Sequence, residues 1–312
     1  MKTSYIKNNV RKGETFHKRK AKLWLYVFLI PGLLIILVFC YFPMYGIFTA
    51  FQDFNPIVGI SRSKWVGMKN FIQLFQSDNF RKIFINSISI NVLRLVWGFP
   101  IPIIVSILFN ELNWKRFNSI SQTILYMPHF ISWVVLSGIV MNILSPSNGI
   151  LNQIIEMFGK KPIAFLSEPA YFRSILVISD IWKETGWGTI VYLAAISAID
   201  GDLYEASKID GAGMLKRIWY ITLPCIRTTI IVLLILRLGS VLRNGFEQIF
   251  MLYTPVVYDV ADVFETFTYR MGIGSGKFSF ATAVGLFQSV IGLILVLITN
   301  KLAQKFGEGG LW

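Results

Sequence analysis

The chain has 312 residues, 54% of them hydrophobic and only 15% charged, whereas soluble domains carry about 25% charged residues. Apolar runs of about 20 residues recur along the sequence, so the composition excludes an ordinary soluble domain and indicates an all-α, polytopic membrane protein. The net charge of +13 does not indicate nucleic-acid binding, because eight of the thirty Lys and Arg residues lie within residues 1–22.

The basic residues 1–22 predict a cytoplasmic N-terminal tail, because positive charge ahead of a spanning helix favours the inner side of the membrane. The apolar run that follows, residues 23–48, is too long for the apolar core of a signal peptide. It also lacks a cleavage pattern of small residues. We therefore expect residues 23–48 to be a retained first span.

Six spans are predicted, each close to the roughly 20 residues that a bilayer requires. They cover residues 23–48, 83–109, 123–144, 174–199, 223–243 and 281–302, which together form one transmembrane domain, 23–302. The inner segments then hold fifteen Lys and Arg residues and the outer segments ten, a bias that comes mainly from the N-terminal tail. This count predicts that both termini, including the tail 303–312, and the segment 200–222 are cytoplasmic.

Ionisable residues in the span 174–199 are functional candidates, because a charge inside a membrane is energetically expensive. Asp180, Lys183, Glu184 and Trp187 have the spacing of one helix face, and Trp182 lies beside them. Two interpretations remain open for this face. It could bind a substrate, or Lys183 could neutralise the carboxylates locally in an ion pair that fixes helix packing.

The segment 200–224 is charged and glycine-rich, and it lies between two apolar runs. We expect Asp202 to cap a short helix, with Glu205 reaching back to the cap. Residues 210–213, Asp-Gly-Ala-Gly, should end that helix, because glycine adopts the left-handed conformation at little steric cost. A second short helix should follow, with Pro224 in the first turn of the next span. Two interpretations are open: Glu205 could serve only as a cap in a simple connecting loop, or the segment could be a rigid helix–turn–helix that a partner binds.

This segment resembles the EAA loop of permease subunits in binding-protein-dependent ABC importers. The resemblance departs at Ser207, where alanine is usual, and at Thr228, where a second proline is common; we expect Thr228 to straighten the start of the next span. Residues 126–133 and 180–188 and the terminal Gly310-Leu311-Trp312 are similar to the carbohydrate branch of these permeases, of the maltose type and especially its polysaccharide and complex-oligosaccharide subunits. The positions that match the loop motif are Glu205, Ala206, Asp210, Gly211, Ala212, Ile221, Leu223 and Pro224.

The resemblance implies a permease fold and a non-catalytic transport subunit. Two permease subunits, this chain and a relative, would line one pathway, and an extracytoplasmic binding protein would deliver the solute. Two ATPase subunits would use ATP and Mg, and the chain itself would bind no cofactor or metal. The sequence agrees in lacking a phosphate-binding loop, since residues 274–277 lack the first glycine and precede Phe278. The residues implied in ATPase coupling are Glu205, Ala206, Ser207, Asp210, Gly211, Ala212 and Gly213.

The substrate implied by the resemblance is a carbohydrate, such as an oligosaccharide or a polysaccharide fragment. Arg237 could contact an acidic or hydroxylated substrate, or it could pair with a carboxylate of another helix. The rival interpretation is an ion-coupled secondary transporter or channel, but the sequence does not display the inverted-repeat halves expected of that class. The predicted substrate-pathway residues are Asp180, Trp182, Lys183, Glu184, Trp187, Arg237 and Asn244.

Overall fold

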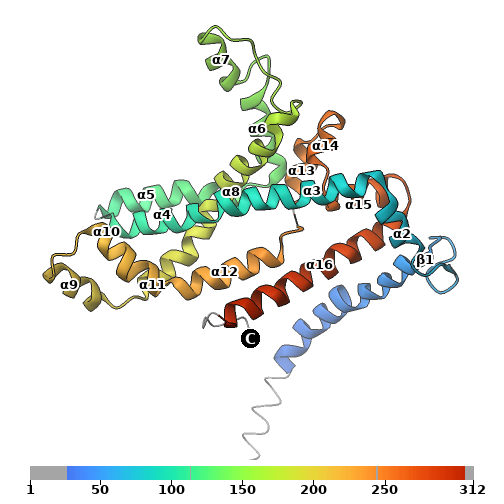
Figure 1. Ribbon diagram of the computed structural model, residues 1–312, viewed down its shortest axis with the longest axis horizontal. Helices are drawn as coiled ribbons and strands as arrows, with labels where there is room; N and C mark the ends of the chain where they lie inside the picture. The colour runs from blue at the N-terminus through green and yellow to red at the C-terminus, as the bar shows by residue number, and fades with distance from the viewer. Residues whose placement is uncertain (1–26, 113, 244, 306–312) are drawn as a thin grey trace, which may run out of the picture. The chain divides into compact units, whose positions relative to one another are not determined.

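The computed structural model describes residues 27–112, 114–243 and 245–305, which are almost entirely helical (Figure 1). The predicted all-α class is therefore confirmed. The chain divides into two compact units, Met1–Gly67 and Met68–Trp312.

The described part of the first unit is one long apolar helix followed by a short hairpin. The helix, Val27–Phe51, passes through a π-helical turn at Leu37–Tyr41 and a 3-10 segment at Phe42–Phe51. Strand β1 (Gln52–Asp53) then pairs antiparallel with β2 (Lys64–Trp65). The Phe51 and Trp65 rings stack at 5.7 Å between centroids, which supports the turn between the helix and the hairpin.

The second unit contains the remaining helices, several of which are joined by π or 3-10 turns (Figure 1). The first half comprises α2 (Lys69–Gln76), α3 (Asp78–Leu93), η3 (Arg94–Gly98), α4 (Pro100–Glu111), α5 (Lys115–Tyr126), η4 (Met127–Phe130), α6 (Trp133–Leu144), α7 (Ile150–Met157) and α8 (Pro169–Ser197). The second half comprises α9 (Gly201–Ile209), α10 (Met214–Arg217), η5 (Ile218–Thr222), α11 (Leu223–Cys225), α12 (Arg227–Gly239), α13 (Phe246–Leu252), η6 (Pro255–Val257), α14 (Tyr258–Ala261), α15 (Phe264–Tyr269), η7 (Arg270–Gly274) and α16 (Phe278–Lys305).

Three helices among the described residues are long and apolar enough to cross a membrane. They are Val27–Phe51, Asp78–Glu111 and Phe278–Lys305. Helix α8 is also long enough, since its 29 residues extend about 43 Å at 1.5 Å per residue. It is less apolar because Asp180, Lys183 and Glu184 lie near its middle.

Two predicted spans are bent rather than straight. The stretch 123–144 lies in a helix pair that bends by 104° between Phe130 and Trp133, just after Pro128 tightens the chain into a 3-10 turn. Residues 223–239 of the stretch 223–243 lie in a pair that bends by 61° at Ile226. The expectation that Thr228 straightens this region is therefore wrong. The bend follows Pro224, which lacks the N–H needed to continue a regular helix.

Helix α8 crosses the middle of the second unit and packs against α3, α4, α5 and α14 (Figure 1). Its buried residues Phe172 and Leu176 join Ile90 of α3, Val140 of α6 and Ile249 of α13 in one apolar core. A second core centres on Phe264 and Phe267 of α15 and on neighbouring residues of α2, α3 and α16. Polar residues in the middle of α8 are thus held between several helices.

Gly186 permits a close contact between α8 and α5. A Cβ atom at this position would lie 2.2 Å from the backbone oxygen of Leu125 in α5. We expect Gly186→Ala to force α5 and α8 apart and to destabilise the protein by roughly 3 kcal/mol, at the upper end for overpacking. Gly138→Ala is the matched control, because a Cβ atom there meets no atom within 4 Å. Thermal unfolding in detergent should show a large loss for the first variant only, and equal stability of the two would contradict the tight contact.

Candidate functional site

Helix α9 begins the segment 200–224 and is capped by Asp200, whose side chain accepts a hydrogen bond from the Asp202 N–H at 3.0 Å. The prediction that Asp202 is the cap is therefore wrong by two residues. The predicted capping role of Glu205 is also wrong. Glu205 is exposed and makes no hydrogen bond or ion pair with any other part of the chain that the structure describes. Its carboxylate is consequently available to a partner.

The end of α9 is a tight glycine turn. Gly211 has φ +69°, so the predicted left-handed turn is confirmed at this position. The Gly211 N–H donates to the Lys208 carbonyl at 3.1 Å, and the Ala212 N–H donates to the Ser207 carbonyl at 2.9 Å. These two bonds form a Schellman motif, which satisfies carbonyls that a helix end leaves open. Gly213 has an ordinary φ of −67° and precedes α10.

Side chains tie the helix–turn–helix to neighbouring elements. Tyr204 Oη and Thr222 Oγ1 lie 2.9 Å apart, which links α9 to the end of η5. Arg217 donates to Glu111 at the end of α4 at 2.9 Å, and both side chains are largely buried. Sequence reasoning missed the contact with Glu111, because no local pattern relates residues more than a hundred positions apart. These contacts make the segment a fixed projection from the helix bundle.

Large apolar side chains are exposed on this projection. Ile209 is 88% exposed, Leu215 is 72% exposed and Leu203 is 48% exposed. Clustered apolar side chains at the surface of a polar segment are typical of a protein-binding site. Glu205 and Ala206 lie on the same short helix, so the segment offers both an acidic group and an apolar surface.

A second candidate site is a cavity of about 200 Å³ at the middle of α8. It brings together four of the predicted pathway residues, Asp180, Glu184 and Trp187 of α8 and Arg237 of α12. Asn244 lies outside the described residues. The complete lining is Gly98, Phe99, Pro102, Asp180, Ile181, Glu184, Thr185, Trp187, Gly188, Tyr192, Leu233 and Arg237.

Asp180 pairs with arginines of two other helical segments. Its Oδ2 lies 3.8 Å from Nε of the buried Arg94 and 3.4 Å from Nη2 of Arg237. Arg94 also donates to Gln248, which in turn donates to the Ser179 hydroxyl at 2.8 Å. The Arg237 side chain remains 43% exposed. The Asp180 charge therefore binds α8 to η3 and α12, and Arg237 still presents part of its guanidinium to the cavity.

Lys183 does not neutralise the carboxylates of its own helix, so that prediction is wrong. The residue is 7% exposed, and its Nζ donates to the carbonyls of His129 at 2.6 Å, Ile131 at 2.7 Å and Pro128 at 3.4 Å. These carbonyls lie at the 104° bend between α5 and α6. Lys183 consequently points away from the cavity and toward the bend.

His129 contacts two of the residues that line the cavity, Glu184 and Trp187. Its Nδ1 lies 3.1 Å from Oε2 of Glu184, and its ring stacks on Trp187 with 4.6 Å between centroids. The Trp187 side chain itself is half exposed. An aromatic face next to a carboxylate and an arginine suits a ligand with hydroxyl groups and flat apolar patches.

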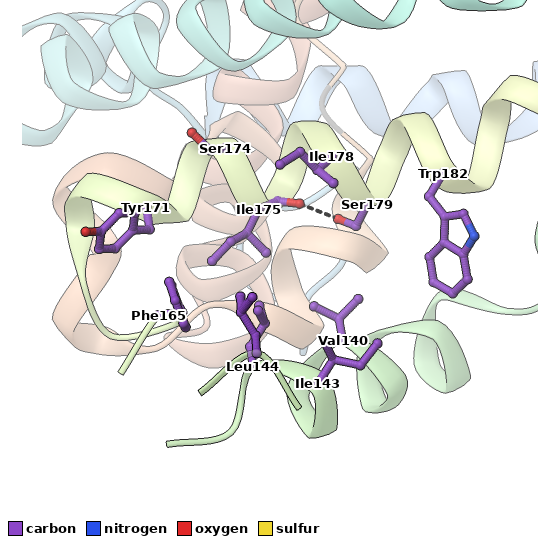
Figure 2. A pocket seen from close by; sticks show the side chains of 11 residues that line it. Val140, Ile143, Leu144, Phe165, Tyr171, Ser174, Ile175, Ile178, Ser179 and Trp182 are labelled. Atoms are coloured by element: carbon purple, nitrogen blue, oxygen red, sulfur yellow. Dashed lines mark hydrogen bonds between the residues drawn. The ribbon is translucent and has the colours of Figure 1, made fainter. Parts of the chain in front are cut away.

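Trp182 lines a different cavity from the other predicted residues. This cavity measures about 360 Å³, and Figure 2 places Trp182 at one end of it, beside Val140 and Ile143 of α6. Two residues along a helix correspond to a rotation of about 200°, so Trp182 and Asp180 point to different sides of α8. The cavity is lined by Val140, Ile143, Leu144, Leu151, Phe165, Tyr171, Ser174, Ile175, Ile178, Ser179 and Trp182. Its almost wholly apolar lining does not suit a hydroxyl-rich ligand.

The chain is similar to known proteins in sequence and in overall fold. Residues 74–308 match a family model described as the inner membrane component of binding-protein-dependent transport systems. The chain is 44% identical to the polygalacturonan/rhamnogalacturonan transport system permease protein YteP of Bacillus subtilis strain 168, over 93% of the chain and 90% of that protein.

Other relatives agree with this match. The chain is 44% identical to protein LplB of Bacillus subtilis strain 168, over 94% of the chain and 92% of that protein. Among solved structures it is similar to a chain of a bacterial alginate ABC transporter in complex with an alginate pentasaccharide-bound periplasmic protein. That similarity has a TM-score of 0.86 and 40% identity, and it covers 94% of this chain and 98% of the other.

Proposed function

The chain belongs to the family of inner membrane components of binding-protein-dependent transport systems, and from this membership we propose that it imports fragments of an acidic polysaccharide. It is a permease subunit of an ABC importer for carbohydrates and lies in the cytoplasmic membrane. The family is one of non-catalytic transport subunits. Membership favours this reading over an ion-coupled secondary transporter or channel.

The proposed partners are the other subunits of a binding-protein-dependent ABC importer. An extracytoplasmic solute-binding protein delivers the substrate, and a second permease subunit completes the pathway. Two ATPase subunits, which bind ATP and Mg, contact the segment 205–224. The exposed Glu205 and the exposed apolar side chains of α9 and α10 support this contact. The proposed topology places residues 1–22, the segment 200–222 and residues 303–312 in the cytoplasm.

The acidic character of the substrate rests on Arg237. Its guanidinium lies beside Asp180 yet remains partly exposed to the cavity that Trp187 also lines. A guanidinium can bind a sugar carboxylate through paired, charge-assisted hydrogen bonds, and an indole can stack on the sugar ring. The names of the relatives support the same class, since one concerns polygalacturonan and another alginate.

Replacing Arg237 tests this assignment. We expect Arg237→Met to reduce uptake of labelled trigalacturonate roughly 10- to 100-fold, the effect of losing a hydrogen bond to a charged group. Arg243→Met is the matched control, because Arg243 lines another cavity. The measurement is initial uptake by cells that express the variant with its partner subunits. Equal uptake by wild type and the Arg237 variant would contradict the role of Arg237 and leave the permease assignment intact.

A further inference from the structure

The bend between α5 and α6 brings several backbone carbonyls together in the interior of the second unit. The carbonyls of Pro128, His129 and Ile131 all lie within 3.4 Å of Lys183 Nζ. The first two belong to η4, where the Pro128 carbonyl also accepts a hydrogen bond from the Ile131 N–H at 3.2 Å. Carbonyl groups at a helix C-terminus also carry partial negative charge and favour a cation.

The Lys183 ammonium donates a hydrogen bond to each of the three carbonyls. It has three N–H donors, and the three carbonyls accept from it. The indole of Trp133, the first residue of α6, lies 5.7 Å from the same nitrogen and adds a cation–π contact. Among the described residues, no carboxylate lies within ion-pair distance of Lys183. The charge is therefore neutralised mainly by backbone oxygens and an aromatic face.

We propose that the carbonyls of Pro128, His129 and Ile131 form an ammonium-binding site, and that Lys183 is a positioning residue that occupies it as a tethered cation. The bound ammonium stabilises the 104° bend and thereby keeps His129 in contact with Trp187 and Glu184. In this way Lys183, which does not line the cavity, controls through His129 the positions of Glu184 and Trp187 in the cavity lining. The link to transport rests on the proposed function, whereas the binding site itself does not.

Truncation with chemical rescue tests the site. Lys183→Ala removes the side chain beyond Cβ, and the lost atoms correspond to n-propylammonium. We expect trigalacturonate uptake to fall at least about tenfold, the effect of losing roughly one strong hydrogen bond, and to recover when n-propylammonium is supplied. Lys183→Met is the matched control, because it fills the same space without a charge and leaves no room for the amine. It should be impaired and should not recover.

A second measurement reports on the bend independently of what is transported. The chain has two histidines, so the rate at which diethyl pyrocarbonate modifies His129 can be followed by mass spectrometry, with His17 as an internal reference. In the purified protein, Lys183→Ala should change the rate at His129, and n-propylammonium should restore it. The neutral analogue n-propanol should not restore it.

The outcomes separate the proposal from the proposed function. In one outcome n-propylammonium restores the His129 reactivity of Lys183→Ala, but the wild type takes up no trigalacturonate. This outcome would support the ammonium-binding site and overturn the substrate assignment. If Lys183→Met matched the wild type both in uptake and in the rate of His129 modification, the proposed ammonium-binding site would be overturned. Loss of uptake in Lys183→Ala with no response to n-propylammonium in either measurement would also overturn it, provided that Lys183→Arg, which keeps the charge, still folds and inserts.

Discussion

Replacing Gly211 by proline is expected to abolish uptake while the protein still inserts into the membrane. Gly211 has φ +69°, whereas proline is restricted to φ near −65°. Proline would also remove the N–H that donates to the Lys208 carbonyl. The Schellman turn would therefore be lost, and α9 would no longer present Glu205 and Ile209 in a fixed orientation. Uptake of trigalacturonate and substrate-stimulated ATP hydrolysis by the assembled transporter measure the effect.

Two glycine variants serve as graded controls for this result. Gly211→Ala keeps the N–H but places a Cβ atom in the left-handed region, at a strain of about 1–2 kcal/mol, so a loss of roughly tenfold is expected. Gly213→Ala should behave as wild type, because Gly213 has φ −67° and a Cβ atom there meets nothing within 4 Å. Normal uptake by the double variant Glu205→Ala, Gly211→Pro would rule out coupling through this segment.

Replacing Asp180 by asparagine is expected to destabilise the helix bundle strongly. The Asp180 side chain is 13% exposed, and its carboxylate lies near both Arg94 and Arg237. Without it, the buried Arg94 and the partly exposed Arg237 would have no carboxylate between their guanidinium groups. Removing one partner of a buried pair costs about 3–5 kcal/mol, because the remaining charge loses its compensation. The amount of folded protein and its thermal stability in detergent measure the effect.

Asp259→Asn is the matched control for this charge loss. Asp259 pairs with Lys82 at 2.7 Å, a shorter distance than either pair of Asp180, but these side chains are 74% and 54% exposed. Exposed pairs contribute only about 0–1 kcal/mol, because water and salt screen them. A similar loss of stability in both variants would show that burial does not determine the importance of the Asp180 pairs.

Local signals in the sequence predicted much of the fold and of the coupling segment. Apolar runs indicate helices, and the glycine at position 211 indicates the left-handed turn that the structure contains. The sequence predicts the cap at Asp202 rather than at Asp200, because both acidic residues precede the same apolar pattern and local composition does not distinguish them. The mean hydropathy of a span does not predict the bends after Phe130 and at Ile226, because it averages over the whole span.

The partners of charged residues could not be predicted, because they come from distant segments. The spacing of residues 180–187 indicated one helix face, and Asp180, Glu184 and Trp187 do line one cavity. Nothing in that spacing reveals that Asp180 pairs with residues 94 and 237. The backbone carbonyls that bind Lys183 carry no sequence signal at all, since every residue has a carbonyl.

The most direct test of an ATP-driven importer is uptake of labelled trigalacturonate into proteoliposomes containing the assembled transporter, with ATP inside and binding protein outside. We expect uptake that requires hydrolysable ATP, persists when ionophores collapse all ion gradients, and is lost in Gly211→Pro but not in Gly213→Ala. Uptake by this chain alone, driven by an ion gradient and unaffected by Gly211→Pro, would contradict the account.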